Sequence, residues 1–353
     1  DATYIYQQDS FNVTAGAAYV DSDRLDTFTL SDVPVFFLDD LETEQIDLKD
    51  MRVYAYGNIT LLPGVIGTVG LSYQDYDQDQ VYNYTDLTGF FPPSSAVNKL
   101  DFDELNPKLG IRAAVTDNLE LRAAYFKVVK PALSSNRTLE PTQVAGFNQF
   151  FDDPNATKST RYGIGLDGNL SPAVSYGVEF TKREIDGLVS PLGGQPFYED
   201  RKELLHRAYA YWTPTDKLAV DLSLEYDLSE NQSGSAVADV RPTDVETYSV
   251  PVSVRYYHPG GFFAGAKATY VDQQVEAAPS YTYQTGGSDF TVVDLVLGYR
   301  LPKRRGIVSI SVQNIFDEDF EYLDDSYRTF QDEPVAGSYL PELGIMGRLT
   351  VNF

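Results

Sequence analysis

The residue types that most often carry catalysis are scarce in this sequence. It has two histidines, His206 and His258, and no cysteine among its 353 residues. Thiolate chemistry, disulfide frameworks and cysteine-based zinc sites are therefore excluded. A barrel hydrolase would need a histidine held beside a serine or an aspartate. His206 falls in a strand-like segment and His258 in a short turn, so we expect no enzyme, no metal site and no cofactor.

Paired carboxylates are the next candidates for chemistry, and Asp221 and Glu225 are the clearest pair. On a strand they share one face, four residues and about 13 Å apart along the chain. The acid and the nucleophile of a retaining glycosidase lie only about 5 Å apart. The spacing therefore argues against glycoside hydrolysis and favours a polar strand face.

Acidic residues also gather in two stretches, 21–48 and 317–333, each with a single arginine. Two interpretations stay open. Such oxygen donors could capture cations, either divalent ions that bridge lipopolysaccharide or a cationic ligand. Alternatively, the stretches are solvated external loops. The run DEDFEYLDD lacks the glycine and the ligand spacing of an EF-hand loop.

The charge balance narrows the partners further. The chain carries 27 Lys and Arg against 52 Asp and Glu, a formal net charge of −25. A phosphate backbone requires a basic surface, so nucleic acid is excluded as a partner, and docking on anionic lipid headgroups is disfavoured. No window approaches the roughly 18 apolar residues of a spanning helix. A transmembrane β-barrel stays open, because its apolar residues occupy only every second position.

Apolar residues do recur at every second position along most of the chain. In 218–227, LAVDLSLEYD, leucine, valine and tyrosine alternate with polar residues, and 174–181, 248–256 and 308–313 repeat the pattern. A helix would need apolar residues three and four positions apart. The pattern predicts about 15 strands. They lie near 2–8, 10–20, 50–60, 64–76, 104–116, 118–129, 159–169, 173–185, 202–212, 217–228, 246–257, 261–273, 288–300, 306–316 and 343–353.

The connectors between these strands alternate in length. Short turns such as 62–65 and 258–261 alternate with long polar segments such as 21–48, 77–102 and 130–157. Tight periplasmic turns and long external loops are typical of outer-membrane barrels. The sequence therefore predicts an all-β protein, a single antiparallel transmembrane β-barrel domain over 1–353. A single-chain barrel has an even strand number, so we expect at least one strand upstream of Asp1 and about 16 or more in all.

Strand parity then assigns the charged residues to a polar lumen. Carboxylates and cations alternate along this face, which could contact a hydrated solute or a plug, or could be a ladder of ion pairs that only holds the wall. Glycines on the same face, Gly16 and Gly298 among them, are expected where the wall curves or where the backbone is closely approached. The predicted lumen-facing residues are Arg112, Arg122, Arg161, Glu179, Asp221, Glu225, Asp227, Arg255, Lys267, Asp294 and Arg348.

The sequence of the C-terminal quarter resembles that of a known family. The last strand, GIMGRLTVNF, ends on Leu349, Val351 and Phe353 and looks like the signal that outer-membrane barrels present to their assembly machinery. The preceding segment VSISVQNIFDEDF resembles the penultimate strand of TonB-dependent receptors. Its motif consists of Asn314, Ile315, Phe316 and Asp317.

Two further segments carry the same resemblance. LNPKLGIRAAVTDNLELRAAYFK at 105–127 is similar to a hairpin of these receptors, and TLEPTQVAGF at 138–147 is similar to their L-x-P-E loop. The resemblance implies an outer-membrane transport barrel. The chain departs from the family in showing neither a plug domain nor a TonB box, and about 15 strands where such barrels have about 22.

Three functions remain compatible with the sequence. The first is TonB-type passage of a solute across the outer membrane, with TonB as partner. The second is a plug-less export pore coupled to a periplasmic scaffold of tetratricopeptide repeats, as in polysaccharide export porins. The third is a structural outer-membrane anchor. All three place the chain in the bacterial outer membrane, in contact with lipid, lipopolysaccharide and the barrel assembly machinery.

Overall fold

The computed structural model describes residues 1–33, 38–89, 91–133, 137–151, 153–189, 196–233, 242–277, 285–322 and 342–351. These residues are almost wholly β-structure. One short 3-10 helix, η3 (Pro302–Arg304), lies in a turn. Over the described ranges, no helix has the length and apolar character needed to cross a membrane.

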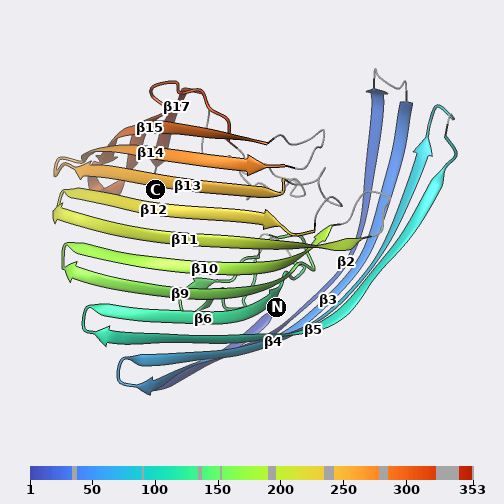
Figure 1. The fold of residues 1–353 in the computed structure, drawn as a ribbon, viewed down its shortest axis with the longest axis horizontal. Helices are drawn as coiled ribbons and strands as arrows, with labels where there is room; N and C mark the ends of the chain where they lie inside the picture. Colours follow the sequence, from blue (N-terminus) through green and yellow to red (C-terminus); the bar gives the residue numbers. More distant parts are fainter. Residues whose placement is uncertain are drawn as a thin grey trace. The chain divides into compact units, whose positions relative to one another are not determined.

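Within these ranges, fifteen strands form one sheet in which successive strands are hydrogen-bonded neighbours, as Figure 1 shows. The pairs β1–β2, β2–β3, β3–β4 and each successive pair from β11–β12 to β16–β17 are antiparallel. A separate two-stranded ladder, β7–β8, lies between β6 and β9 in the chain. The strands are β1 (Ala2–Gln7), β2 (Phe11–Val33), β3 (Leu38–Leu62), β4 (Val65–Asp86), β5 (Ser94–Thr116), β6 (Leu119–Val129), β7 (Gln143–Val144), β8 (Phe147–Asn148), β9 (Lys158–Ser171), β10 (Val174–Val189), β11 (Phe197–Thr215), β12 (Leu218–Asn231), β13 (Asp244–Tyr257), β14 (Phe262–Glu276), β15 (Gly286–Leu301), β16 (Gly306–Gln313) and β17 (Gly344–Val351).

The predicted all-β antiparallel fold is confirmed. β1 and β17 stand first and last in the strand order. A further strand upstream of Asp1, and the extent of the whole domain, stay predictions.

The prediction of long loops is wrong for two segments, which consist largely of strand. β2 and β3 pair continuously from Phe11↔Ile59 to Leu30↔Asp40, so most of 21–48 is sheet. β4 likewise reaches Asp86, within the segment 77–102 predicted as a loop. These extensions are polar on both faces, so they lack the apolar alternation that marks a strand beside lipid. Their ladder hydrogen bonds do not require such alternation.

By contact density the chain comprises two compact units, which we describe separately. The first holds Asp1–Ile111, Ala124–Arg161 and Ile185–Asp200, and the second holds Arg112–Ala123, Tyr162–Glu184 and Arg201–Phe353. In each unit the exposed strand face is apolar and the covered face is polar. In β4, Gln74 is 1% exposed while Leu71 is 46% exposed, and in β12 Ser223 is buried between exposed Leu222 and Leu224. This inverted pattern suits a wall that meets lipid on its apolar face.

Glycines on the polar face make room for aromatic rings. A Cβ at Gly16 would lie 2.5 Å from the Tyr54 hydroxyl, whose ring leans across from β3. A Cβ at Gly298 would collide with the ring of Phe263 on β14. A close backbone approach is present at Gly16, where the Ala2 carbonyl lies 2.6 Å from the Cβ position, whereas the contact at Gly298 is to a side chain. Any larger residue would displace the ring that packs there.

Candidate functional site

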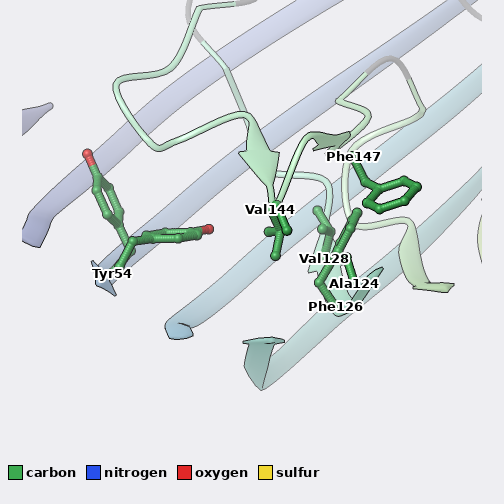
Figure 2. Close-up of a cluster of buried hydrophobic side chains, with 8 residues drawn as sticks. Tyr54, Ala124, Phe126, Val128, Val144 and Phe147 are labelled. Carbon is green, nitrogen blue, oxygen red and sulfur yellow. The ribbon is translucent and has the colours of Figure 1, made fainter. Parts of the chain in front are cut away.

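A segment between β6 and β9 folds back onto the polar face of the first unit. Its β7–β8 hairpin turns at Ala145 and Gly146, both with positive φ, as a two-residue turn requires. Val144 and Phe147 are buried in one hydrophobic cluster with Tyr54 and Phe126 (Figure 2). The hairpin is therefore held by an apolar contact on an otherwise polar face.

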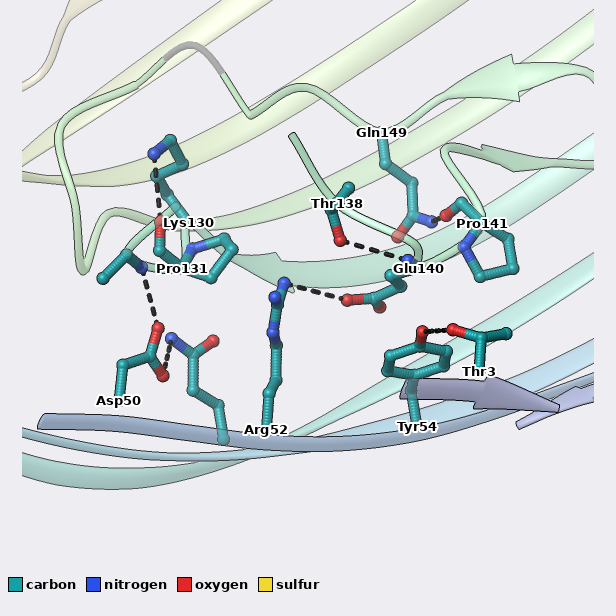
Figure 3. Close-up of polar contacts among 12 residues, drawn as sticks. Thr3, Asp50, Arg52, Tyr54, Lys130, Pro131, Thr138, Glu140, Pro141 and Gln149 are labelled. Carbon is teal, nitrogen blue, oxygen red and sulfur yellow. Dashed lines mark hydrogen bonds and ion pairs between the residues drawn. The ribbon is translucent and has the colours of Figure 1, made fainter. Parts of the chain in front are cut away.

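A buried ion pair fastens the same segment. Glu140 accepts a hydrogen bond from the Arg52 guanidinium at 3.2 Å (Figure 3). It accepts another from the Tyr56 hydroxyl at 2.5 Å. The Arg52 and Glu140 side chains are only 4% and 3% exposed. Gln149 donates to the Tyr56 hydroxyl at 3.2 Å and to the Pro141 carbonyl. We call Arg52, Tyr56, Glu140 and Gln149 the loop clamp.

The start of the segment is tied down separately. The carboxylate of Asp50 accepts hydrogen bonds from the backbone N–H of Ala132 at 2.7 Å and from the Gln74 amide at 3.0 Å (Figure 3). Lys130 donates to the carbonyl of Pro131 and to the side chain of Asn155, each at 3.0 Å. The start of the segment is therefore fixed to β3 through Asp50, and Lys130 joins the start of the segment to Asn155 near its end.

A cavity of about 550 Å³ lies beside this segment in the first unit. Its strand residues come from the extensions of β2, β3 and β4, and its remaining residues follow β6. The lining mixes charge, amide and aliphatic groups, which suits a small solute with both polar and apolar parts. The lining includes Ser22, Arg24, Leu48, Gln78, Leu133 and Asn155.

In the second unit, one predicted cation organises the polar face. Arg122 holds Asp167 and Glu179 at 2.6 Å each. The Tyr209 hydroxyl donates a further hydrogen bond to Asp167. A Cβ at Gly165 would come within 3.1 Å of the Arg122 guanidinium, so the glycine leaves room for that group. The cluster joins β6, β9, β10 and β11 on one face.

The other predicted lumen residues fall on the same polar faces by strand register and parity. Most of them have partners on neighbouring strands. Arg112 pairs with Glu120 at 2.8 Å. Asp221 accepts from Ser253 at 2.6 Å and lies 3.7 Å from Arg255.

The remaining members are placed by one contact or by register. Glu225 lies 3.6 Å from Arg207, and Arg161 donates to the carbonyl of Asn148 at 2.9 Å. In register, Asp227 is opposite Leu205, Lys267 is opposite Asp294, and Arg348 is opposite Ser309. The structure thus brings Arg122, Asp167 and Glu179 into one cluster and distributes the others as pairs along the wall.

Three carboxylates meet at the end of the second unit that lies away from the short turns. Asp244 on β13 is in register with Glu230 on β12 and Glu276 on β14. Burial, and then the charges of its two neighbours, raise the pKa of Asp244 above its usual 3.8. A hydrogen bond from Lys202 lowers the pKa of Glu230. These residues lie beyond the 9–11 or so positions that a strand needs to cross the hydrocarbon.

A family model described as TonB dependent receptor-like, beta-barrel matches residues 2–315. The chain belongs to the TonB-dependent receptor β-barrel family. Proteins of this family lie in the bacterial outer membrane, and the apolar strand faces described above suit that location. No curated protein matches the sequence closely enough to count as a relative.

Solved structures share the fold of this TonB-dependent receptor barrel. The copper transporter OprC is 16% identical with a TM-score of 0.67, over 99% of this chain and 56% of that one. The ferric-catecholate import receptor Fiu from E. coli K12 is 13% identical with a TM-score of 0.59, over 90% and 47%. The ferric yersiniabactin uptake receptor FyuA from Yersinia pestis is 14% identical with a TM-score of 0.55, over 98% and 55%. The chain therefore spans about half the length of these receptors.

The receptor motif near the C-terminal end forms a hydrogen-bonded turn. Asn314 has φ 47°, donates to the carbonyl of Glu318 at 2.8 Å and accepts from its N–H at 2.9 Å. Asp317, with φ 54°, accepts from the N–H of Leu343 at 3.0 Å. The turn brings Phe320 back onto the wall, where its ring stacks on Phe290 at 3.9 Å.

Ile315 and Phe316 complete this motif. The N–H of Ile315 donates to the carbonyl of Val293 at 2.9 Å, while the Phe316 side chain is exposed. In the final strand, Leu349 and Val351 lie on the exposed apolar face. Phe353 lies outside the described residues, as do the acidic positions 323–333 of the second acidic stretch.

The loop clamp is the functional feature that sequence reasoning missed. The sequence of 138–147 resembles the receptor loop, but it gives no indication that Glu140 pairs with Arg52, which lies 88 residues away. The ring of His206 lies 5.1 Å from Phe180 and 5.6 Å from Tyr226. Within the described ranges, no group of three or more His, Asp or Glu is arranged to hold a metal ion.

Proposed function

We propose that the chain is the barrel part of a receptor that takes up a small solute across the outer membrane with energy from TonB. The observation that carries this proposal is the clamped segment 130–157 beside the cavity of about 550 Å³. A barrel that only anchors another protein has no need for a segment folded onto its polar face and fixed by a buried ion pair. Family membership supports the same function.

The solute class follows from the lining of the cavity. Arg24, Gln78 and Asn155 offer charge and amide groups, while Leu48 and Leu133 offer apolar surface. A ligand with hydrogen-bonding groups on an apolar frame satisfies both. The volume suits a molecule of small-ligand size, since ligand pockets span about 300–1,000 Å³. In this proposal the chain catalyses no reaction.

The lumenal and terminal residues take roles in the same proposal. The cluster around Arg122 and the pairs along the wall line the path of the solute or contact a plug. Leu349, Val351 and Phe353 form the signal for the barrel assembly machinery. Lipopolysaccharide surrounds the external end of the strands.

The proposal is tested with the full-length protein in its outer membrane. We expect the purified protein to bind the periplasmic domain of TonB. Cells that express it should deplete a solute from a defined nutrient mixture, and deletion of TonB should abolish that depletion. Depletion that persists without TonB, together with no TonB binding, would contradict the proposal.

The cavity is tested with two tryptophan variants on β2. Ser22→Trp places an indole in the cavity and should lower solute depletion at least several-fold. Leu25→Trp is the matched control, because Leu25 is an exposed residue on the opposite face of the same strand. Equal depletion by the two variants would remove the cavity from the path.

A further inference from the structure

We propose that the turn between β15 and β16, together with an apolar groove beside it, binds an anionic phospholipid of the periplasmic leaflet. The proposal rests on one basic turn and one hollow in the lipid-facing wall, both in the second unit. It goes beyond solute uptake, because it concerns how the barrel wall selects its own lipid.

The groove lies on the apolar face of four neighbouring strands. It has a volume of about 430 Å³. One row runs in register from Tyr256 through Ala264 and Leu297 to Ile310. Ala264 is the small member of that row, and it forms the floor between two larger side chains. An acyl chain fits this surface because the row is apolar from end to end.

A second row closes the groove toward the short turns. The rings of Phe262 and Tyr299 face each other at 4.7 Å, and His258 also lines the hollow. Aromatic rings with a polar tip favour the boundary between hydrocarbon and headgroups. The end of the groove is therefore placed where a phospholipid changes from acyl chain to phosphate.

The basic turn lies at that same end. Lys303, Arg304 and Arg305 follow Tyr299 within six residues, and all three are exposed. Lys303 and Arg304 have φ of 60° and 59°, in the left-handed region that residues with a Cβ seldom adopt. The turn is held by the Arg305 N–H, which donates to the Pro302 carbonyl at 3.4 Å. Three successive cations are thus presented together.

The charge of the surroundings identifies the occupant. The chain as a whole carries −25, yet neither 295–310 nor 256–264 contains an acidic residue. A juxtamembrane basic cluster attracts anionic lipid headgroups, and the attraction acts only within a Debye length. A zwitterionic lipid would fill the groove equally well but gain little from the turn. The combination therefore selects a lipid with a net negative headgroup.

The test uses the full-length protein in nanodiscs of phosphatidylethanolamine and phosphatidylglycerol in equal amounts, with bound lipid counted by native mass spectrometry. We expect roughly tenfold enrichment of phosphatidylglycerol among retained lipids, since each basic group near the surface favours it several-fold. The triple variant Lys303→Gln, Arg304→Gln, Arg305→Gln should lose the enrichment. Ala264→Phe, which fills the groove, should reduce the number of retained lipids.

The control is Lys217→Gln, which removes a cation from a different short turn and should leave the enrichment unchanged. Equal retention of the two lipids by the unmodified protein would overturn the proposal. Enrichment that survives the triple variant would remove the turn from the site. Retention unaffected by Ala264→Phe would remove the groove, and with it the two-part site.

Discussion

Among the single substitutions considered, removal of the Glu140 carboxylate from the loop clamp has the largest expected effect on stability. In Glu140→Ala, the Arg52 guanidinium stays buried without its ion-pair partner, and the Tyr56 hydroxyl loses its acceptor at 2.5 Å. Breaking a buried pair by removal of one partner costs about 3–5 kcal/mol. Both side chains are under 5% exposed, so solvent cannot replace the lost contact. We expect the free energy of unfolding to fall by about that amount.

The matched control breaks an exposed pair in the same protein. Arg112 and Glu120 are 46% and 32% exposed, so Glu120→Ala should cost about 0–1 kcal/mol. Urea unfolding of the full-length protein in detergent, followed by circular dichroism, measures both variants. A double variant, Arg52→Met with Glu140→Leu, should recover much of the loss, because apolar side chains of similar volume replace the pair without a buried charge.

Limited proteolysis links the energy to the segment itself. When the clamp is broken, protease should cut within 130–157 faster, while cleavage elsewhere should keep its rate. Equal unfolding energies for Glu140→Ala and Glu120→Ala, with no change in cleavage, would refute the reasoning. The ion pair would then contribute nothing to holding the segment.

Three further predictions test the wall. Gly16→Ala should cost about 1–3 kcal/mol because its Cβ meets a tyrosine hydroxyl and a backbone carbonyl. Gly57→Ala should cost little, because its Cβ would make only ordinary van der Waals contacts, at 3.8 and 3.9 Å; thermal unfolding compares the two variants. Asp244→Asn should stabilise the protein by about 0.2–1 kcal/mol at neutral pH. Because the pKa of Asp244 is raised in the folded protein, ionisation of this carboxyl opposes folding. The stability gained by the variant should therefore vanish at pH values well below 3.8, the ordinary pKa of the group. A gain in stability at every pH would contradict this prediction. Leu222→Arg should cost about 2–4 kcal/mol in a lipid refolding assay and Ser311→Arg much less, since only Leu222 faces lipid; equal costs would reverse the faces.

The sheet could be predicted from sequence wherever lipid imposes a pattern. Strands such as 218–227 alternate because one face must be apolar, and β12 spans Leu218–Asn231 accordingly. The polar extensions of β2 and β3 carry no such pattern, so they looked like loops. Strand parity alone predicted that Arg122, Asp167 and Glu179 lie on the polar face of the sheet.

The loop clamp could not be predicted from the sequence either, and the physical reason is a different one. Its ion pair joins residues from β3 and from the segment after β6, and sequence spacing holds no record of that contact. The long polar segment 130–157 looked like an external loop. Its fold against the wall depends on tertiary packing of Val144 and Phe147, which only the assembled face provides.

The most direct test of the central claim is the orientation of the strands in the outer membrane. The chain has no cysteine, so spin labels can be placed singly at positions 220–225 of β12 in the full-length protein freed of any other cysteine. A barrel wall of the TonB-dependent receptor family predicts that oxygen accessibility in the membrane alternates with period two. The maxima should fall at Val220, Leu222 and Leu224, whose side chains face lipid. Accessibility without that alternation, or with maxima at Asp221, Ser223 and Glu225, would contradict the account.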